Sequence, residues 1–307
     1  MVKEKTFSFF LGCIMPNRYP AIEKATKFVM KKLDYEILEM ERATCCPAPG
    51  VFRSFNKVDW MVAGARNICI AEKMDADILT VCNGCFGTLQ EINKHLKENE
   101  EHREIVNEKL KLIGDYEFKG TIDVRHVTEV LGYEVGPWGV EDLITRKLNA
   151  RAAIHYGCHF LKPTRIREIE SSEAPTIIEE FIEVLGVESV RFKEQLTCCG
   201  AGGGVKAYDG KASDTIFEEK MKNINDVQPD FILDICPFCH LEYETAQDQL
   251  NKNKGCNYDY PVIHLSQLVA YCMGMSPEFV GLQYQLMGKD YIFNLEEKIK
   301  KEEEEAA

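Results

Sequence analysis

Short, compact runs of apolar residues alternate along the chain with longer segments in which apolar residues recur every three or four positions. The compact runs are rich in β-branched and aromatic residues, which is typical of buried strands, and the periodic segments are typical of helices. In the first half the expected strands are residues 7–11, 35–40 and 78–81, and the expected helices are 21–33, 58–74 and a long helix after Cys85. Strands that alternate with helices predict an α/β fold with a mostly parallel sheet.

The second half of the chain repeats this order. Its expected strands are residues 152–156, 189–192 and 231–235, and its first expected helix is 176–185. A charged segment at 94–111 is inserted late in the first half. We therefore predict two Rossmann-like halves related by a pseudo-twofold, residues 1–148 and 149–290. A charged tail at 291–307 follows them and is typical of a solvated or frayed helix end.

Ten of the thirteen cysteines fall into two sets of five that follow the same order. In each half a Gly-Cys pair is followed by Thr-Cys-Cys and then by a strand that leads into Cys-x-x-Cys. The first set is Cys13, Cys45, Cys46, Cys82 and Cys85, and the second set is Cys158, Cys198, Cys199, Cys236 and Cys239. Several of these cysteines come directly after expected strands. Because parallel sheets bind ligands at the carboxyl ends of their strands, each set should converge on one site.

The composition, 45% hydrophobic and 28% charged, is typical of a packed globular protein. Lys and Arg total 37 against 50 Asp and Glu, and the formal charge of -13 disfavours binding to nucleic acid. No apolar window approaches the roughly 18 residues of a membrane span, and the run at 7–11 is too short for a secretory signal. We therefore expect a cytoplasmic protein with reduced thiols, in which clustered cysteines are metal ligands or redox groups.

Five cysteines in each set fit an iron-sulfur cluster better than a zinc site. Tetrahedral zinc uses four ligands, whereas neighbouring cysteines such as Cys45 and Cys46 point apart and can bind different metals of one cluster. The dense cysteine run of an ordinary cubane cluster does not occur in the sequence, which favours an unusual cluster geometry. Structural zinc and a thioredoxin-like dithiol at Cys82 and Cys85 stay open as alternatives.

The two sets resemble the cysteine-rich CCG domain, written CX(n)CCGX(n)CXXC, which occurs in duplicate in the B subunit of methanogen heterodisulfide reductase. The match covers roughly residues 7–272. The resemblance implies that each set binds one noncubane 4Fe-4S cluster. It also implies that the mixed disulfide of coenzyme M and coenzyme B is reduced to two thiols between the clusters.

The same resemblance implies partner chains. These are a ferredoxin-like C subunit, which is the electron donor, and, beyond it, a flavin-containing A subunit, with a hydrogenase or formate dehydrogenase as a candidate source of electrons. Related duplicated domains occur in iron-sulfur subunits of other oxidoreductases. The alternative function is therefore that of an electron-transfer iron-sulfur subunit in a hydroxyacid or glycerol-3-phosphate dehydrogenase complex.

The first set departs from the CCG pattern, because Pro47 follows Cys46 where Gly200 follows Cys199. Proline has no N–H to donate to sulfur, so the geometry of the first loop should differ. The glycine-rich segment 200–206 lacks the residue order of a phosphate-binding loop. We expect its backbone to come close to the cluster and to aim N–H groups at sulfide.

Histidines and basic residues near the cysteines are candidate catalytic and substrate-binding groups. His155 and His159 bracket Cys158, and either is placed to protonate a departing thiolate or to act as a hydrogen-bond partner of the cluster. An anionic disulfide in an acidic protein requires local cations. The candidates, each of which follows a cluster ligand, are Arg18, Lys162, Arg165 and Lys206, with a solvated surface charge as the alternative for each.

Four residues have structural expectations instead. His126 and His264 are matched by the repeat and are expected at strand-to-helix junctions. Cys69 and Cys272 lie in apolar stretches outside the two sets, and we expect them to pack as small buried residues. Cys256 also lies outside the sets, and we do not expect it to be a ligand.

Overall fold

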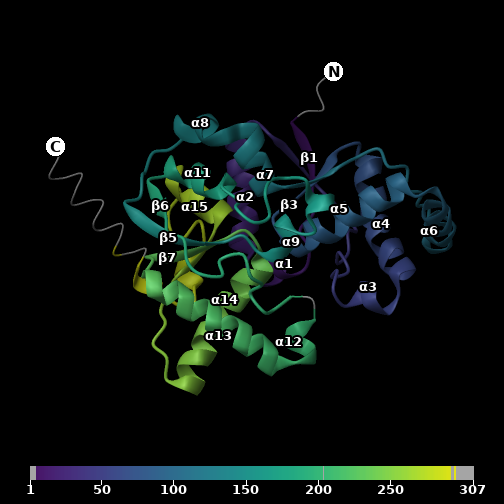
Figure 1. Cartoon of the computed structure of the whole chain (residues 1–307). Helices are drawn as coiled ribbons and strands as arrows, with labels where there is room; N and C mark the ends of the chain where they lie inside the picture. Colours follow the sequence, from purple (N-terminus) through teal and green to yellow (C-terminus); the bar gives the residue numbers. More distant parts are fainter. Residues whose placement is uncertain (1–4, 203, 292–293, 295–307) are drawn as a thin grey trace.

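Two four-stranded parallel sheets form the framework of the computed structural model, which describes residues 5–202, 204–291 and 294 (Figure 1). The first sheet has the order β2-β1-β3-β4 and the second has the order β6-β5-β7-β8. The strands are β1 Thr6–Phe9, β2 Glu36–Glu39, β3 Asp77–Thr80, β4 Val124–His126, β5 Ala150–His155, β6 Val187–Ser189, β7 Phe231–Asp234 and β8 Val262–His264. Because both sheets share one strand order, the predicted α/β fold with two similarly built halves is confirmed.

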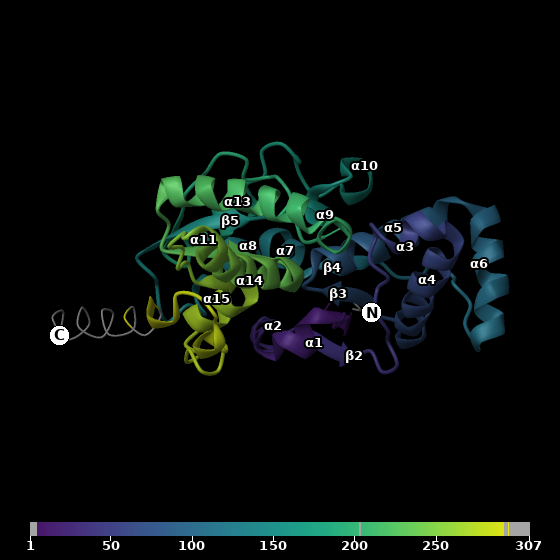
Figure 2. The same cartoon turned by 90° about the horizontal axis from the view of Figure 1, so that it is seen from below.

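Helices surround both sheets. Those of the first half are α1 Ile14–Arg18, α2 Pro20–Lys32, α3 Phe52–Phe55, α4 Lys57–Met74, α5 Asn83–Glu98, α6 Glu100–Ile113 and α7 Val127–Glu129, followed by a π-helical turn Val130–Val135 and α8 Gly136–Glu141. Those of the second half are α9 Cys158–Leu161, α10 Thr164–Arg167, α11 Ile177–Glu183, α12 Val205–Tyr208, α13 Gly210–Val227, α14 Pro237–Lys254 and α15 Leu265–Cys272, with a 3-10 turn Leu282–Tyr284. The charged segment 94–111 spans the end of α5 and most of α6, which packs on the outer side of α4 (Figures 1 and 2).

Equivalent helices in the two halves begin with similar caps. The Asn56 side chain accepts the backbone N–H groups of Val58 and Asp59 at the start of α4, and Asp209 accepts the N–H of Ala212 at the start of α13. Such side chains satisfy N–H groups that have no partner within the helix. His126 and His264 form equivalent capping boxes at the starts of α7 and α15, which confirms their expected place at strand-to-helix junctions.

The structure corrects three details of the expected elements. Strand β6 lies at Val187–Ser189 instead of 189–192. The Val190 N–H makes the last hydrogen bond to β5, at 2.9 Å from the Ala152 carbonyl oxygen, and Val190 and Phe192 are buried in the core beyond the end of the strand. Helix α5 begins at Asn83, so Cys85 lies inside it and not before it. The short strands β4 and β8 were not expected. Residues 295–307, most of the expected charged tail, lie outside the described residues.

The two halves pack against each other around a large core cluster that contains buried residues of both, and a smaller cluster lies within the second half. Helix α2 of the first half lies along α15 of the second, and α5 packs against α9 and α10 (Figure 2). Asn83 Nδ2 donates to the Tyr156 carbonyl at 2.8 Å, and His264 Nε2 lies 3.3 Å from the Val81 carbonyl oxygen. These contacts bring the carboxyl ends of β3 and β5 to a shared interface. Within the described part of the chain, no helix is both long enough and apolar enough to cross a bilayer.

Candidate metal-cluster site

One cavity of about 410 Å³ is lined by all ten cysteines of the two sets. Cys13, Cys82, Cys158 and Cys236 follow the carboxyl ends of β1, β3, β5 and β7, as the repeat predicts. The cavity also receives residues from both halves, among them Ile14 and Val51 from the first and Lys206 and Phe238 from the second. The two sets therefore meet at the interface between the halves, where both border the same cavity.

Two long helices point their N-termini at the cavity. Cys82 caps the 16-residue helix α5, and Cys236 caps the 18-residue helix α14. The Cys236 N–H donates to Asp234 Oδ1 at 3.0 Å, and the Cys82 N–H donates to Thr80 Oγ1 at 3.4 Å. The positive end of a helix dipole stabilises a thiolate, which is the form of cysteine that binds metal.

The sulfur atoms lie close to one another without forming disulfides. All thirteen cysteines are free. The Sγ atoms of Cys199 and Cys239 are 3.5 Å apart, and those of Cys82 and Cys236, which belong to different halves, are 3.7 Å apart. Two thiolates on one tetrahedral metal, with bonds of about 2.3 Å, lie about 3.8 Å apart. The spacing therefore fits ligation of metal ions, and ten thiolates exceed what zinc sites use.

Neighbouring thiols also share their protons. The hydrogen bond with Cys45 raises the pKa of Cys13, and burial raises it further. In the second set, hydrogen bonds from Cys158 and Cys199 lower the pKa of Cys198. Some sulfurs thus become thiolates at the expense of neighbours that keep their protons. A cationic metal core compensates all ten thiolates at once, so the donor set fits iron-sulfur chemistry.

The structure separates the two candidate histidines. His159 lines the ten-cysteine cavity, and burial, followed by the charge of Arg167, lowers its pKa. His155 is 1% exposed and does not line that cavity. It lies behind the second set, with a ring nitrogen and the Sγ atoms of Cys199 and Cys239 all within 4.8 Å of one another. Only His159 has access to a molecule in the cavity.

The four candidate cations also differ in position. Lys206 lines the cavity, where its Nζ is 2.5 Å from an oxygen of the buried Glu242. Arg18 and Arg165 are exposed and line neither this cavity nor the neighbouring one. Lys162 lines the neighbouring cavity. A basic residue that follows a cluster cysteine in the sequence therefore does not always lie beside the cysteines in space.

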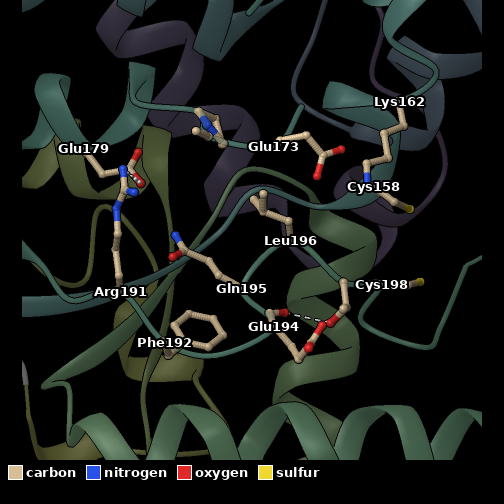
Figure 3. A pocket seen from close by; sticks show the side chains of 13 residues that line it. Cys158, Lys162, Glu173, Glu179, Arg191, Phe192, Glu194, Gln195, Leu196 and Cys198 are labelled. Atoms are coloured by element: carbon tan, nitrogen blue, oxygen red, sulfur yellow. Dashed lines mark hydrogen bonds and ion pairs between the residues drawn. The ribbon is translucent and has the colours of Figure 1, made fainter. Parts of the chain in front are cut away.

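The neighbouring cavity has a volume of about 650 Å³ and shares Cys158 and Cys198 with the first. In Figure 3 these two cysteines lie at one side, with Lys162 next to Cys158. Arg191 and Glu179 face each other at the opposite side, with 4.0 Å between charged atoms. The second cysteine set is thus bordered by two cavities, one shared with the first set and one of its own.

Two residues on helices bind the loops that contain the Cys-Cys pairs, and neither of them was identified from the sequence. Lys220 Nζ, on α13, donates to the backbone carbonyls of Glu194, Gln195 and Thr197 at 3.2, 2.9 and 2.6 Å. Asn67, on α4, accepts the Thr44 N–H at 2.9 Å and donates to the Cys45 carbonyl at 3.3 Å. Burial lowers the pKa of Lys220 to about 8.

A sequence signal for this pair exists. Asn67 and Lys220 each follow the Thr of the Thr-Cys-Cys motif by 23 positions, since 67 minus 44 and 220 minus 197 are equal. Aligning the repeats through the helices, and not only through the cysteines, would have found both residues. Both predicted packing cysteines, Cys69 and Cys272, are buried as expected.

The loops after the two Cys-Cys pairs differ as the sequence suggests. Gly200 has a φ of +92°, and its N–H donates to Cys198 Sγ at 3.3 Å. A Cβ at Gly200 would lie 2.8 Å from the Ser213 carbonyl oxygen, so only glycine fits this approach. Pro47 has no N–H, and its carbonyl instead accepts from Trp60 Nε1 at 3.0 Å. The predicted donation of a backbone N–H to sulfur is therefore found beside the second set.

Comparison with known proteins connects this site to a family. The cysteine-rich domain CCG matches residues 7–90 and again residues 152–243. The chain is 44% identical to the B subunit of the ferredoxin/F(420)H(2)-dependent CoB-CoM heterodisulfide reductase of Methanosarcina acetivorans, covering 90% of this chain and 92% of that protein. It is 32% identical to a protein of Archaeoglobus profundus named for its likeness to the heterodisulfide reductase B subunit, over 90% of this chain and 93% of that protein.

More distant similarities extend to other proteins. The membrane anchor subunit of 8-methylmenaquinol:fumarate reductase from Wolinella succinogenes is 28% identical over 92% of this chain and 98% of that protein. A crystal structure of a hypothetical protein from Helicobacter pylori matches with a TM-score of 0.72 at 15% identity, over 93% of this chain and 52% of that one. At this identity the second similarity concerns the fold alone.

Proposed function

The chain belongs to the family of duplicated CCG cysteine-rich domains that includes the B subunits of heterodisulfide reductase, and from this we propose that it is the catalytic subunit of such an enzyme. The proposed substrate is the mixed disulfide of coenzyme M and coenzyme B. The observation that carries the proposal is the convergence of all ten cysteines on one interfacial cavity. A disulfide bound there would lie next to both sets at once.

Each set is proposed to hold one noncubane 4Fe-4S cluster. The ligands would be Cys13, Cys45, Cys46, Cys82 and Cys85 in the first half and Cys158, Cys198, Cys199, Cys236 and Cys239 in the second. Clusters held by these residues would supply the two electrons that cleavage of a disulfide requires. Support comes from the 3.5 Å between the Sγ atoms of Cys199 and Cys239 within the second set, and from the N-termini of α5 and α14, which favour the thiolate form.

The reaction consumes two electrons and two protons. The S–S bond breaks, one thiol forms from each half of the substrate, and both products leave the cavity. His159 is proposed to donate a proton to a product thiolate, because it is the candidate histidine that lines the cavity. Its lowered pKa keeps the imidazole neutral at rest, and a neutral ring is too weak an acid to protonate a thiolate by itself. His159 is therefore proposed as a relay, in which one ring nitrogen takes up a proton from solvent as the other releases its proton to the thiolate.

The cavity residues also suggest how the substrate is oriented. Leu11, Ile14, Val51 and Phe238 provide apolar surface for the chains that flank the disulfide. Lys206 provides the cation for an anionic substrate group, and Glu242 holds its ammonium in place. Arg18, Lys162 and Arg165 are not placed to contact a molecule in this cavity, so their proposed substrate role is restricted to the approaches.

Electrons are proposed to reach this protein from other chains. Named relatives are B subunits of multisubunit reductases, which indicates a hetero-oligomer. By family membership the expected partners are a ferredoxin-like C subunit, which is the direct donor, and a flavin-containing A subunit, with a hydrogenase or formate dehydrogenase upstream.

Anaerobic purification tests the proposal. The protein should contain iron and acid-labile sulfide, and with a reduced viologen dye as donor it should convert the heterodisulfide to two thiols. Cys82→Ser should lose activity and part of its iron, whereas the matched control Cys256→Ser, outside both sets, should retain both. Protein that contains zinc and no sulfide would refute the cluster assignment. Full iron and sulfide without disulfide turnover would favour an electron-transfer subunit instead.

A further inference from the structure

The two cysteine sets follow one pattern, but the residues behind them differ between the halves. Three residues before the first cysteine of each set stand Phe10 and His155. Four residues after the closing cysteine stand Leu89 and Tyr243. All four side chains are buried. Equivalent positions are therefore apolar behind the first set and carry hydrogen-bond donors behind the second.

His155 and Tyr243 are buried without hydrogen-bond partners. Among the described residues, neither ring nitrogen of His155 has a hydrogen-bond partner, and the Tyr243 hydroxyl has none either. The two rings contact each other edge to face, with centroids 5.0 Å apart. Buried polar groups are normally satisfied, so unsatisfied donors side by side indicate an acceptor that the protein itself does not provide. The His155 ring lies within 4.8 Å of the sulfurs of Cys199 and Cys239, which places that acceptor at the second set.

A buried charge adds to the difference. The Lys220 ammonium lies beneath the loop that ends at Cys198, held by three carbonyl groups of that loop. At the equivalent place behind the first set stands the neutral Asn67. Both side chains are buried, so solvent does not screen the positive charge. The second set thus lies near a fixed cation, whereas the first set has a neutral amide at the same place.

We propose that His155 and Tyr243 donate hydrogen bonds to the inorganic core held by the second cysteine set, and that these bonds, with the Lys220 charge, make this centre easier to reduce than the first. This inference rests on the proposed function, since it requires an iron-sulfur core in each set. Reduction adds one electron and one negative charge to a centre without breaking a bond. Hydrogen bonds and a nearby cation stabilise that added charge.

The order of reduction follows from this difference. The donor is a ferredoxin-like protein or, in the test, a reduced viologen dye. Its first electron reduces the centre of the second half, and the next electron reduces the centre of the first half. His159 and Lys206, which line the shared cavity, also belong to the second half. The more readily reduced centre, the proton donor and the substrate cation therefore come from the same half.

The test is a redox titration of the complete, anaerobically loaded protein, followed by electron paramagnetic resonance. Cys13→Ser and Cys158→Ser assign the two signals to their halves. The key variant is His155→Phe, which gives the second half the residue found at Phe10. At a fixed potential it should lower the reduced-to-oxidised ratio of the second-half centre about tenfold, as expected for one lost hydrogen bond to a charged group. Tyr243→Phe should shift the ratio in the same direction.

Two further variants separate hydrogen bonding from packing. His155→Gln keeps an N–H donor and should restore part of the lost ratio, which a merely structural role of His155 would not predict. Phe10→Leu alters packing at the matched position of the first half and should leave the second-half centre unchanged.

The results distinguish this inference from the proposed function. If iron and sulfide are present in full but both centres titrate together, or if neither His155→Phe nor Tyr243→Phe changes the ratio, the inference is wrong and the proposed function stands. If the wild-type protein contains neither iron nor sulfide, both are wrong. Should His155→Phe fail to load its cluster, Tyr243→Phe decides alone, because it removes a single hydroxyl group.

Discussion

Replacing Gly12 by alanine should remove one cluster and spare the other. Gly12 precedes Cys13 and has a φ of +69°, a conformation that costs an alanine about 1 kcal/mol. The new Cβ would lie 2.8 Å from Cys85 Sγ, whereas ordinary van der Waals contact begins at 3.4 Å. Relief of the clash requires a shift of about 0.6 Å, and ligand positions in metal sites tolerate only about 0.2 Å. The first set should therefore lose its metal while the second keeps it.

The assay is iron and acid-labile sulfide per chain after anaerobic reconstitution, together with the free energy of unfolding. Iron should fall by about half in Gly12→Ala. Gly202→Ala is the matched control, because a Cβ there meets nothing within 4 Å. Gly157→Ala provides a contrast, since its Cβ would meet Asn83 Nδ2 at 2.2 Å and disturb packing between the halves more than a ligand. Wild-type iron content and unchanged spectra in Gly12→Ala would refute the reasoning.

Three further predictions concern other parts of the site. Lys220→Met should lower the free energy of unfolding by about 3 kcal/mol, because carbonyl groups of the loop lose a charged donor. Asn67→Leu should lower it by about 2 kcal/mol, because the Thr44 N–H loses its acceptor. Urea denaturation measures both values. Burial lowers the pKa of His126 to about 3, so below pH 6.5 the unfolded chain binds a proton that the folded chain does not. Between pH 7 and 5.5 His126 should account for a loss of about 1.2 kcal/mol of stability, and His155, whose pKa burial also lowers to about 3, should account for a similar loss. His126→Asn, which keeps a capping side chain, should therefore reduce the total loss measured in unfolding curves at pH 7 and 5.5 by about 1.2 kcal/mol without abolishing it. Lys206→Met should raise KM for the anionic disulfide about tenfold with unchanged iron content. Arg18→Met should leave KM unchanged, because Arg18 does not line the cavity. Equal KM values for the two variants would show that Lys206 does not bind the substrate.

Much of the fold and the cysteine site could be predicted because the same pattern of strands, helices and cysteine motifs occurs twice in the sequence. Repeated Gly-Cys, Thr-Cys-Cys and Cys-x-x-Cys motifs follow strands, and parallel strands place such loops at one sheet edge. The strand expected at 189–192 was placed too late in the sequence because Val190 and Phe192 are buried beyond the end of β6, and an apolar pattern indicates burial and not strand pairing. The short strands β4 and β8 are only three residues long, which is too short for a periodic signal.

The roles of residues around the cysteines were harder to predict. His155 ends a strand and His159 lies in the following helix, so residues four positions apart reach opposite sides of the same cysteine set. Arg18 and Arg165 follow cysteines closely but extend to the surface, because sequence distance does not fix side-chain direction. Asn67 and Lys220 approach from distant helices, and such long-range contacts leave little local signal.

Joining the two sheets in one polypeptide removes a restriction that a pair of identical chains would obey. In a symmetric homodimer every residue at the axis is presented twice, so a substitution that improves one side changes the other in the same way. Here the two copies share strand order and cysteine spacing, yet each position can vary alone, as Phe10 and His155 show. Two copies of one domain in a single chain can therefore differ at matched positions while keeping the same strand order and cysteine spacing.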